Sequence, residues 1–138
     1  MINKIYIAGP LFNFHERNYL EMIAKALEDD GFDCFLPHRD QIGVTDEELS
    51  QHNMTATTKQ KIFTNDLNAL KASDLTVALL TGQDIDSGTA AEIGYSYANK
   101  KPINMAVIAT AIVMSVAIKS SSPQPLSPND INSMVKGG

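Results

Sequence analysis

Residues 75–95 read LTVALLTGQDIDSGTAAEIGY, an apolar run followed by an acidic, Gly-containing turn and a helical pattern. The apolar run, Leu75 to Leu80, is typical of a strand that a parallel sheet buries on both faces. After the turn, the pattern predicts a helix from about Thr89 to Asn99. Since ligands of open α/β sheets bind at the carboxyl ends of the strands, we expect a site at this turn.

The segments around this stretch continue the alternation of strand and helix. Apolar runs predict strands over residues 4–8, 32–36 and 103–108, and helical spacing predicts helices over residues 16–30 and 55–71. Residues 38–53 are polar and aperiodic, which indicates an excursion over the surface. The order predicts a single-domain α/β fold, an open parallel sheet flanked by helices on both faces, as in flavodoxin-like or Rossmann-like three-layer sandwiches. We expect this domain to span residues 1–118, with a loosely ordered or subunit-contacting tail over residues 119–138.

Composition narrows the choice of partner. The formal net charge is −5, which disfavours a nucleic acid polymer because such binding relies on Lys and Arg at the phosphates. The apolar stretch 103–118 is shorter than the roughly 20 residues that span a bilayer, so we expect no membrane partner.

Cys34 is the single cysteine, and no signal peptide precedes the first strand. Both features favour a cytoplasmic location, with Cys34 as a buried and inert thiol.

Glu92 is the first candidate for chemistry. It follows the acidic turn and lies among small residues that let a substrate approach, so it is a candidate nucleophile or general base. Thr89 and Glu92 also have the spacing of a capping box, in which Glu92 would reach back to the Thr89 amide. The two interpretations share one geometry, because the first turn of a helix favours an ionised carboxylate.

Asp66 and Asp86 are the other acids of interest. Asp66 lies three residues after Phe63 and four before Leu70, so helical periodicity places it on their inward face. It would then either pair locally or line a pocket. Asp86 would either stabilise the turn or take part in the site. His15, His38 and His52 show no metal-ligand spacing.

Five segments in this order resemble the nucleoside 2-deoxyribosyltransferase family. They cover residues 4–12, 65–68, 72–74, 86–95 and 101–103, and so run over about three quarters of the chain. The resemblance implies that Glu92 is the nucleophile that attacks the anomeric carbon of deoxyribose. It implies that Asp86 and Asp66 handle the departing and incoming base, and that Tyr6 holds the nucleophilic carboxylate in place.

The resemblance also implies the remaining features of the site. Gln41 would contact the base. From its own position directly after the first strand, rather than from the resemblance, we expect Phe12 to lie beside the base. The expected substrate-binding residues are Gly9, Phe12, Gln41, Ser87 and Gly88. The partners would be a nucleoside and a free nucleobase, with no metal or organic cofactor. The family further implies a homo-oligomer with active sites near subunit interfaces, in which a carboxyl-terminal segment or an asparagine of a neighbouring subunit closes the pocket. The carboxyl-terminal quarter of this chain departs from the family pattern, and residues 104–105 and residues 131–134 are the two candidates to replace that feature.

The implied reaction is transfer of 2-deoxyribose between nucleobases through a covalent glycosyl-enzyme, with retention of configuration. One alternative is a hydrolase that acts on 2′-deoxynucleoside 5′-monophosphates. The bulky residues 11–14 favour an unphosphorylated nucleoside, whereas His15 and Arg17 favour this alternative. A second alternative is a non-catalytic nucleotide-binding module, which would have no need for all four of Glu92, Asp86, Asp66 and Tyr6.

Overall fold

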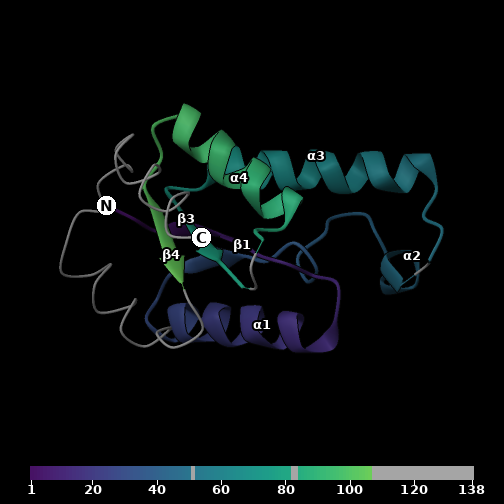
Figure 1. Cartoon of the computed structure of the whole chain (residues 1–138), viewed down its shortest axis with the longest axis horizontal. Coiled ribbons are helices and arrows are strands. Elements are labelled where there is room, and N and C mark those ends of the chain that lie inside the picture. The colour runs from purple at the N-terminus through teal and green to yellow at the C-terminus, as the bar shows by residue number, and fades with distance from the viewer. Residues whose placement is uncertain (51, 82–83, 107–138) are drawn as a thin grey trace.

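The computed structural model describes residues 1–50, 52–81 and 84–106, which form strands and helices in alternation (Figure 1). In chain order the elements are β1 (Lys4–Ala8), α1 (Phe14–Asp29), β2 (Asp33–Phe35), α2 (Asp46–Ser50), α3 (Ala56–Ala72), β3 (Leu75–Leu79), α4 (Ser87–Ala98) and β4 (Ile103–Ala106). The predicted domain boundary at residue 118, the tail over 119–138 and the segment 131–134 lie outside the described residues.

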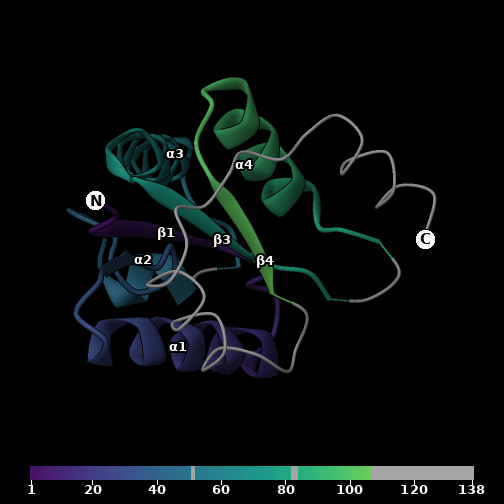
Figure 2. The same cartoon turned by 90° about the vertical axis from the view of Figure 1, so that its left-hand side faces the viewer.

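The four strands form one parallel sheet in the order β2-β1-β3-β4. Helix α1 covers one face of this sheet, and α3 and α4 lie side by side on the other (Figures 1 and 2). The predicted three-layer α/β architecture is therefore confirmed. From β1 the chain passes first to β2 and later to β3 on the opposite side, so the strand order reverses beside β1. Such a reversal opens a crevice at the carboxyl ends of the strands.

Alternate residues of β1 enter two separate cores. Ile5 and Ile7 pack with Leu20 and Leu27 of α1 on one face of the sheet. Tyr6 and Ala8 belong to the opposite cluster, together with Leu70 of α3 and Ala78 of β3. The two-residue period of a strand thus directs the Tyr6 side chain into the layer of α3 and α4.

Helix α1 begins two residues before the predicted start, because Asn13 is its N-cap. The Asn13 side chain accepts a hydrogen bond from the Glu16 amide at 3.0 Å, and the Glu16 carboxylate accepts one from the Asn13 amide at 3.2 Å. This capping box satisfies two amides that no helical carbonyl reaches. Gly31 then ends the segment with φ at +93°, a conformation that glycine adopts readily.

The structure adds detail to one sequence prediction and corrects another. The segment 38–53, expected to cross the surface, contains the short helix α2. Thr45 precedes this helix, and its hydroxyl accepts a hydrogen bond from the Glu48 amide. The capping box proposed for Thr89 and Glu92 does not form, because Asp86 caps α4 instead. The helix therefore starts at Ser87, which leaves the Glu92 carboxylate free for another contact.

The remaining sequence expectations concern burial. Cys34 is buried and free, as predicted. Burial raises the pKa of its thiol to about 12, which keeps the thiol protonated. Among the helices of the described residues, none is long and apolar enough to cross a membrane.

Candidate active site

Tyr6 and Glu92 meet between the sheet and α4. The Tyr6 hydroxyl donates a hydrogen bond to Glu92 Oε1 at 2.6 Å, although the two residues lie 86 positions apart in the chain. Tyr6 is fully buried, and its ring stacks on Phe35 of β2 with the centroids 5.6 Å apart. A rigid aromatic ring thus holds a carboxylate in one place.

A second contact fixes how α4 lies on the sheet. The hydroxyls of Thr76 in β3 and Ser96 in α4 are 2.8 Å apart, and both residues are fully buried. Ser96 lies one helical turn after Glu92, so the two residues share a face of the helix. The hydroxyl pair and the Tyr6 contact together determine where Glu92 points.

The surroundings of Glu92 favour proton uptake. Burial, the largest cause, raises the pKa of Glu92 to about 7, while the hydrogen bond from Tyr6 acts in the opposite direction. The negative charges of Asp66 and Asp86 raise it further. Burial, followed by the charges of Glu92 and Asp66, raises the pKa of Tyr6 above its ordinary value, so the phenol remains a neutral donor.

Asp66 projects from α3 and is held by Gln41. The Gln41 side chain donates from Nε2 to Asp66 Oδ1 at 2.8 Å and to the Pro37 carbonyl at 2.7 Å. Burial raises the pKa of Asp66 to about 6, against the opposing effect of the Gln41 hydrogen bond. The expectation that Phe63 shares a buried face with Asp66 is wrong, because Phe63 is 61% exposed. The face that these residues share borders a pocket, where no element of the described structure covers the Phe63 ring.

Asp86 lies at the start of α4 and caps it. Its Oδ2 accepts hydrogen bonds from the Thr89 amide at 3.0 Å and from the Thr89 hydroxyl at 3.2 Å. A Cβ atom at Gly88 would lie 3.1 Å from the same oxygen, so a larger residue there would crowd the carboxylate. Ser87, beside it, is the exposed first residue of the helix.

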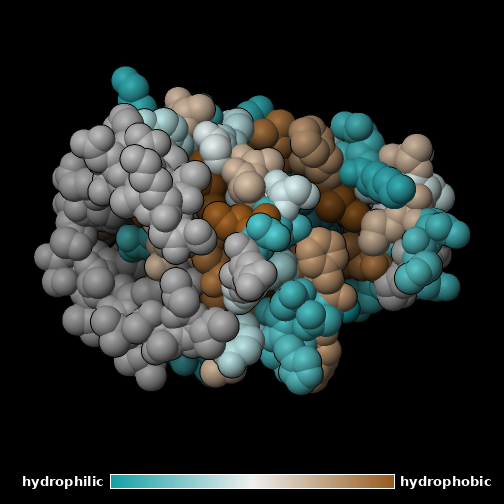
Figure 3. Space-filling model, viewed as in Figure 1, coloured by the Kyte–Doolittle hydropathy of each residue, from teal (hydrophilic) through white to brown (hydrophobic). Residues whose placement is uncertain are grey.

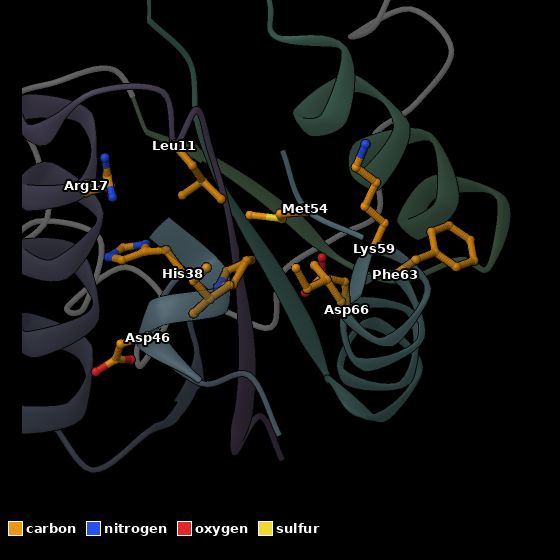
Figure 4. A pocket seen from close by; sticks show the side chains of 11 residues that line it. Leu11, Arg17, His38, Asp46, Met54, Lys59, Phe63 and Asp66 are labelled. Atoms are coloured by element: carbon orange, nitrogen blue, oxygen red, sulfur yellow. The ribbon is translucent and has the colours of Figure 1, made fainter. Parts of the chain in front are cut away.

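Two pockets border Asp66 and Asp86, and neither pocket includes Glu92 in its lining. The larger, which we name the Asp66 pocket, has a volume of about 610 Å³ and lies between α1 and α3 (Figure 4). Its lining includes Leu11, Arg17, His38, Asp46, Met54, Lys59, Ile62, Phe63 and Asp66. The smaller, the Asp86 pocket, has a volume of about 200 Å³ and includes Pro10, Phe12, Glu16, Leu80, Asp84 and Asp86. On the face shown in Figure 3, apolar side chains gather between α1 and the two helices α3 and α4.

The expected substrate-binding residues Gln41, Phe12 and Gly9 lie in different surroundings. Gln41 contacts Asp66, whereas Phe12 is 77% exposed and lines the Asp86 pocket. Gly9 serves the packing of the fold, because a Cβ atom there would lie 2.5 Å from Leu20 Cδ2 and 3.2 Å from Leu79 Cβ.

The sequence pointed to Arg17 as a phosphate contact but not to Lys59 and His38, the other basic residues that line the Asp66 pocket. Lys59 extends from α3 and Arg17 from α1, while His38 follows the end of β2 (Figure 4). The His38 ring makes a 2.9 Å hydrogen bond from Nε2 to Glu21 on α1. His38 lies directly after the second predicted strand. Because ligands of open α/β sheets bind at the carboxyl ends of the strands, this position could have identified His38 as a candidate site residue.

Comparison with known proteins places this geometry in a family. Residues 5–123 match the model of the nucleoside 2-deoxyribosyltransferase family. A search of curated proteins found no match.

Three solved structures resemble the chain. A conserved protein from Enterococcus faecalis V583 is 33% identical, with a TM-score of 0.60 over 76% of this chain, which spans 63% of that protein's length. A 2-deoxyribosyltransferase from Bacillus psychrosaccharolyticus shares the fold with a TM-score of 0.67 at 24% identity, covering 90% of this chain and 99% of that one. The CMP N-glycosidase BcmB of Clostridium botulinum shares it with a TM-score of 0.50 at 19% identity, over 84% and 81% of the two chains. The family match covers most of the sequence, and the chain therefore belongs to the nucleoside 2-deoxyribosyltransferase family.

Proposed function

We propose that this protein transfers 2-deoxyribose from one nucleobase to another through a covalent glycosyl-enzyme on Glu92. The observation that carries the proposal is the Glu92 carboxylate, held by the Tyr6 hydroxyl at 2.6 Å and electrostatically coupled to Asp66 and Asp86. The family description and the fold shared with a 2-deoxyribosyltransferase support the same reaction.

In the first step Glu92 attacks the sugar. Tyr6 occupies Oε1, so Oε2 forms the bond to the anomeric carbon while the bond from that carbon to the base nitrogen breaks. The electron pair of the broken bond stays on the base. The protonated carboxyl group of Asp66 or Asp86 then supplies the proton that neutralises the departing base. Asp86 uses Oδ2 to cap α4, so its Oδ1 would face the ligand.

In the second step a new base attacks the same carbon. A nitrogen of the incoming base displaces the ester oxygen, which restores the Glu92 carboxylate. The proton on that nitrogen passes to the carboxylate that gave up its proton in the first step. Two inversions give overall retention, as in retaining glycosidases.

Both acids titrate near neutrality, and the reaction uses the minority form of the enzyme in which Glu92 is ionised while Asp66 keeps its proton. A nucleophile must be ionised, and Glu92 loses its proton at a pH of about 7. A general acid must be protonated, and Asp66 keeps its proton up to a pH of about 6. Both values lie close to neutrality, where a proton moves between enzyme and base with little change in free energy.

A second candidate is hydrolysis of the N-glycosidic bond of nucleoside 5′-monophosphates. The observation that favours it is the trio of basic side chains along the Asp66 pocket, Arg17, His38 and Lys59, which suits a phosphate. The CMP N-glycosidase shares the fold at 19% identity, which leaves this reaction as a candidate.

One assay separates the two reactions. Purified protein is incubated with thymidine and adenine, with thymidine alone, and with thymidine 5′-monophosphate alone, and the products are separated by chromatography. Transfer predicts deoxyadenosine in the first mixture and little free thymine in the second. Thymine released faster from the monophosphate, with no deoxyadenosine, would favour the hydrolase. No product in any mixture, together with retained ligand binding, would favour the non-catalytic module.

A further inference from the structure

Behind Asp66 lies a chain of side-chain amides that the proposed reaction does not use directly. Asn65, next to Asp66 on α3, donates from Nδ2 to Gln41 Oε1 at 3.1 Å and to the Ile42 carbonyl at 2.8 Å. Gln41 donates in turn from Nε2 to the Pro37 carbonyl at 2.7 Å and to Asp66 Oδ1 at 2.8 Å. The path therefore runs from a loop carbonyl through two amides to the carboxylate.

Backbone carbonyls identify which end of each amide is the NH₂ group. A carbonyl only accepts hydrogen bonds, so the group of Asn65 that faces Ile42 and the group of Gln41 that faces Pro37 must be NH₂ groups. The Asn65 NH₂ group then faces Gln41 Oε1, and the Gln41 NH₂ group faces Asp66. Both N–H bonds of Gln41 Nε2 are occupied, so Gln41 acts on a bound base through Asp66.

We propose that Asn65 is a positioning residue, which holds the Gln41 amide in the one orientation that presents its NH₂ group to the Asp66 carboxylate. The proposal rests on the proposed function, since it assigns Asp66 the handling of the base. Without Asn65, Gln41 Oε1 loses its donor, and the Pro37 carbonyl is the remaining backbone partner that restrains the side chain. A Gln41 amide that moves away from Asp66 withdraws a hydrogen bond from the carboxylate and so favours the protonated carboxyl group.

The Asn65 side chain hydrogen-bonds to Gln41 and to the Ile42 carbonyl rather than to the charged groups described around Asp66. Tyr6 of β1 and Glu92 of α4 are electrostatically coupled to Asp66. Within the Asp66 pocket, the groups that surround it are Lys59 on its own helix, Arg17 of α1, Asp46 of α2 and His38 after β2. A change in the titration of Asp66 on substitution of Asn65 would thus report on Gln41 rather than on a displaced ion pair.

The test is carbon-13 NMR titration of the Asp66 carboxyl group in the full chain, with the signal assigned from Asp66→Asn. Asn65→Ala should raise the titration midpoint by about one pH unit, because the carboxylate loses a charge-assisted hydrogen bond. Asn65→Asp should raise it further, because a carboxylate would then face Gln41 Oε1. Asn68→Ala and Asn68→Asp are the matched controls, since Asn68 is exposed on the same helix.

A double-mutant cycle decides whether Asn65 acts through Gln41. In a Gln41→Ala background, Asn65→Ala should leave the Asp66 midpoint where Gln41→Ala alone puts it. The same shift with and without Gln41, or no shift with Gln41 present, would overturn the proposal. Circular dichroism and the urea midpoint identify variants that fail to fold.

Activity supplies an independent measurement. If the protein transfers deoxyribose, Asn65→Ala should move the alkaline limb of the kcat/KM profile upward in step with the NMR midpoint, whereas Asn68→Ala should not. If the parent has no activity, the proposed function fails, while the titration still tests the positioning role of Asn65.

Discussion

At the scale of single residues, the hydrogen bond between Tyr6 and Glu92 is the contact on which the site depends. Because this bond lowers the pKa of Glu92, Tyr6→Phe should raise that pKa and move the acidic limb of kcat/KM to higher pH. A hydrogen bond to a charged group contributes roughly 1.5–3 kcal/mol, so kcat/KM at neutral pH should fall roughly 10- to 100-fold. Tyr19→Phe, on the exposed side of α1, is the control. An unchanged acidic limb in Tyr6→Phe would show that the phenol does not govern Glu92.

The two acids also predict the shape of the pH profile. Glu92 becomes an ionised nucleophile above a pH of about 7, and Asp66 stops being a protonated acid above about 6. The profile of kcat/KM should therefore be bell-shaped with its maximum between these values, and the two limbs belong to the coupled pair. Asp66→Asn should lower the rate and remove the alkaline limb. If the alkaline limb persists in that variant, another group, such as Asp86, is the acid.

At the scale of secondary-structure elements, the contact between Thr76 and Ser96 fixes α4 on the sheet. Ser96→Ala should leave the buried Thr76 hydroxyl without its partner and lower the free energy of unfolding by about 1–3 kcal/mol. Replacing both residues, as Thr76→Val with Ser96→Ala, should recover part of that loss because no unpaired hydroxyl remains. Urea denaturation of the two single variants and the double variant measures this. Additive losses would mean that the two hydroxyls do not act as a pair.

The sequence predicts strands better than it predicts the ends of helices. The bounds of β1 follow from apolar residues that stop at Gly9 and Pro10, and those of β3 follow in the same way. The sequence places the start of α4 two residues late because Asp86 and Thr89 both have side chains that can cap a helix, and in the fold Asp86 accepts the hydrogen bond from the Thr89 amide. Helical periodicity groups Phe63 with Asp66, but it does not tell whether a pocket or a core covers that face.

At the scale of the whole molecule, the site combines residues that are distant in the chain. Resemblance to a family suggested the pairing of Tyr6 with Glu92, and the structure brings them together. The links from Asn65 and Asp66 to Gln41 span 24 and 25 positions between a helix and an irregular loop. Patterns of local periodicity carry no signal for such contacts, so they required the folded chain.

Concentrating buried acids should lower the stability of the whole domain at alkaline pH. Folding raises the pKa of Glu92 from 4.5 to about 7 and that of Asp66 from 3.8 to about 6. The folded state therefore holds protons that the unfolded state releases, so stability falls as the pH rises from about 4 to 7 and stays lower above that. Below pH 4 both groups are protonated in either state, and the effect vanishes.

Removing the buried charge should thus stabilise the protein. Glu92→Gln should increase the free energy of unfolding at pH 8 by about 1–3 kcal/mol, after allowance for partial exposure, and by less at pH 5. Urea denaturation at the two pH values checks this, with Asp33→Asn, exposed at the start of β2, as the control. An equal effect at pH 5 and pH 8 would mean that burial of the Glu92 charge is not the cause.

Mass spectrometry of the trapped intermediate measures whether Glu92 carries the sugar. The protein is mixed with thymidine, quenched rapidly with acid, and digested, and the peptides are searched for one deoxyribosyl group. We expect this group on the peptide that contains Glu92, attached through an ester to that side chain. Glu92→Gln should show neither the modification nor transfer to adenine. A deoxyribosyl group on a different residue, or parental transfer by Glu92→Gln, would mean that Glu92 is not the nucleophile.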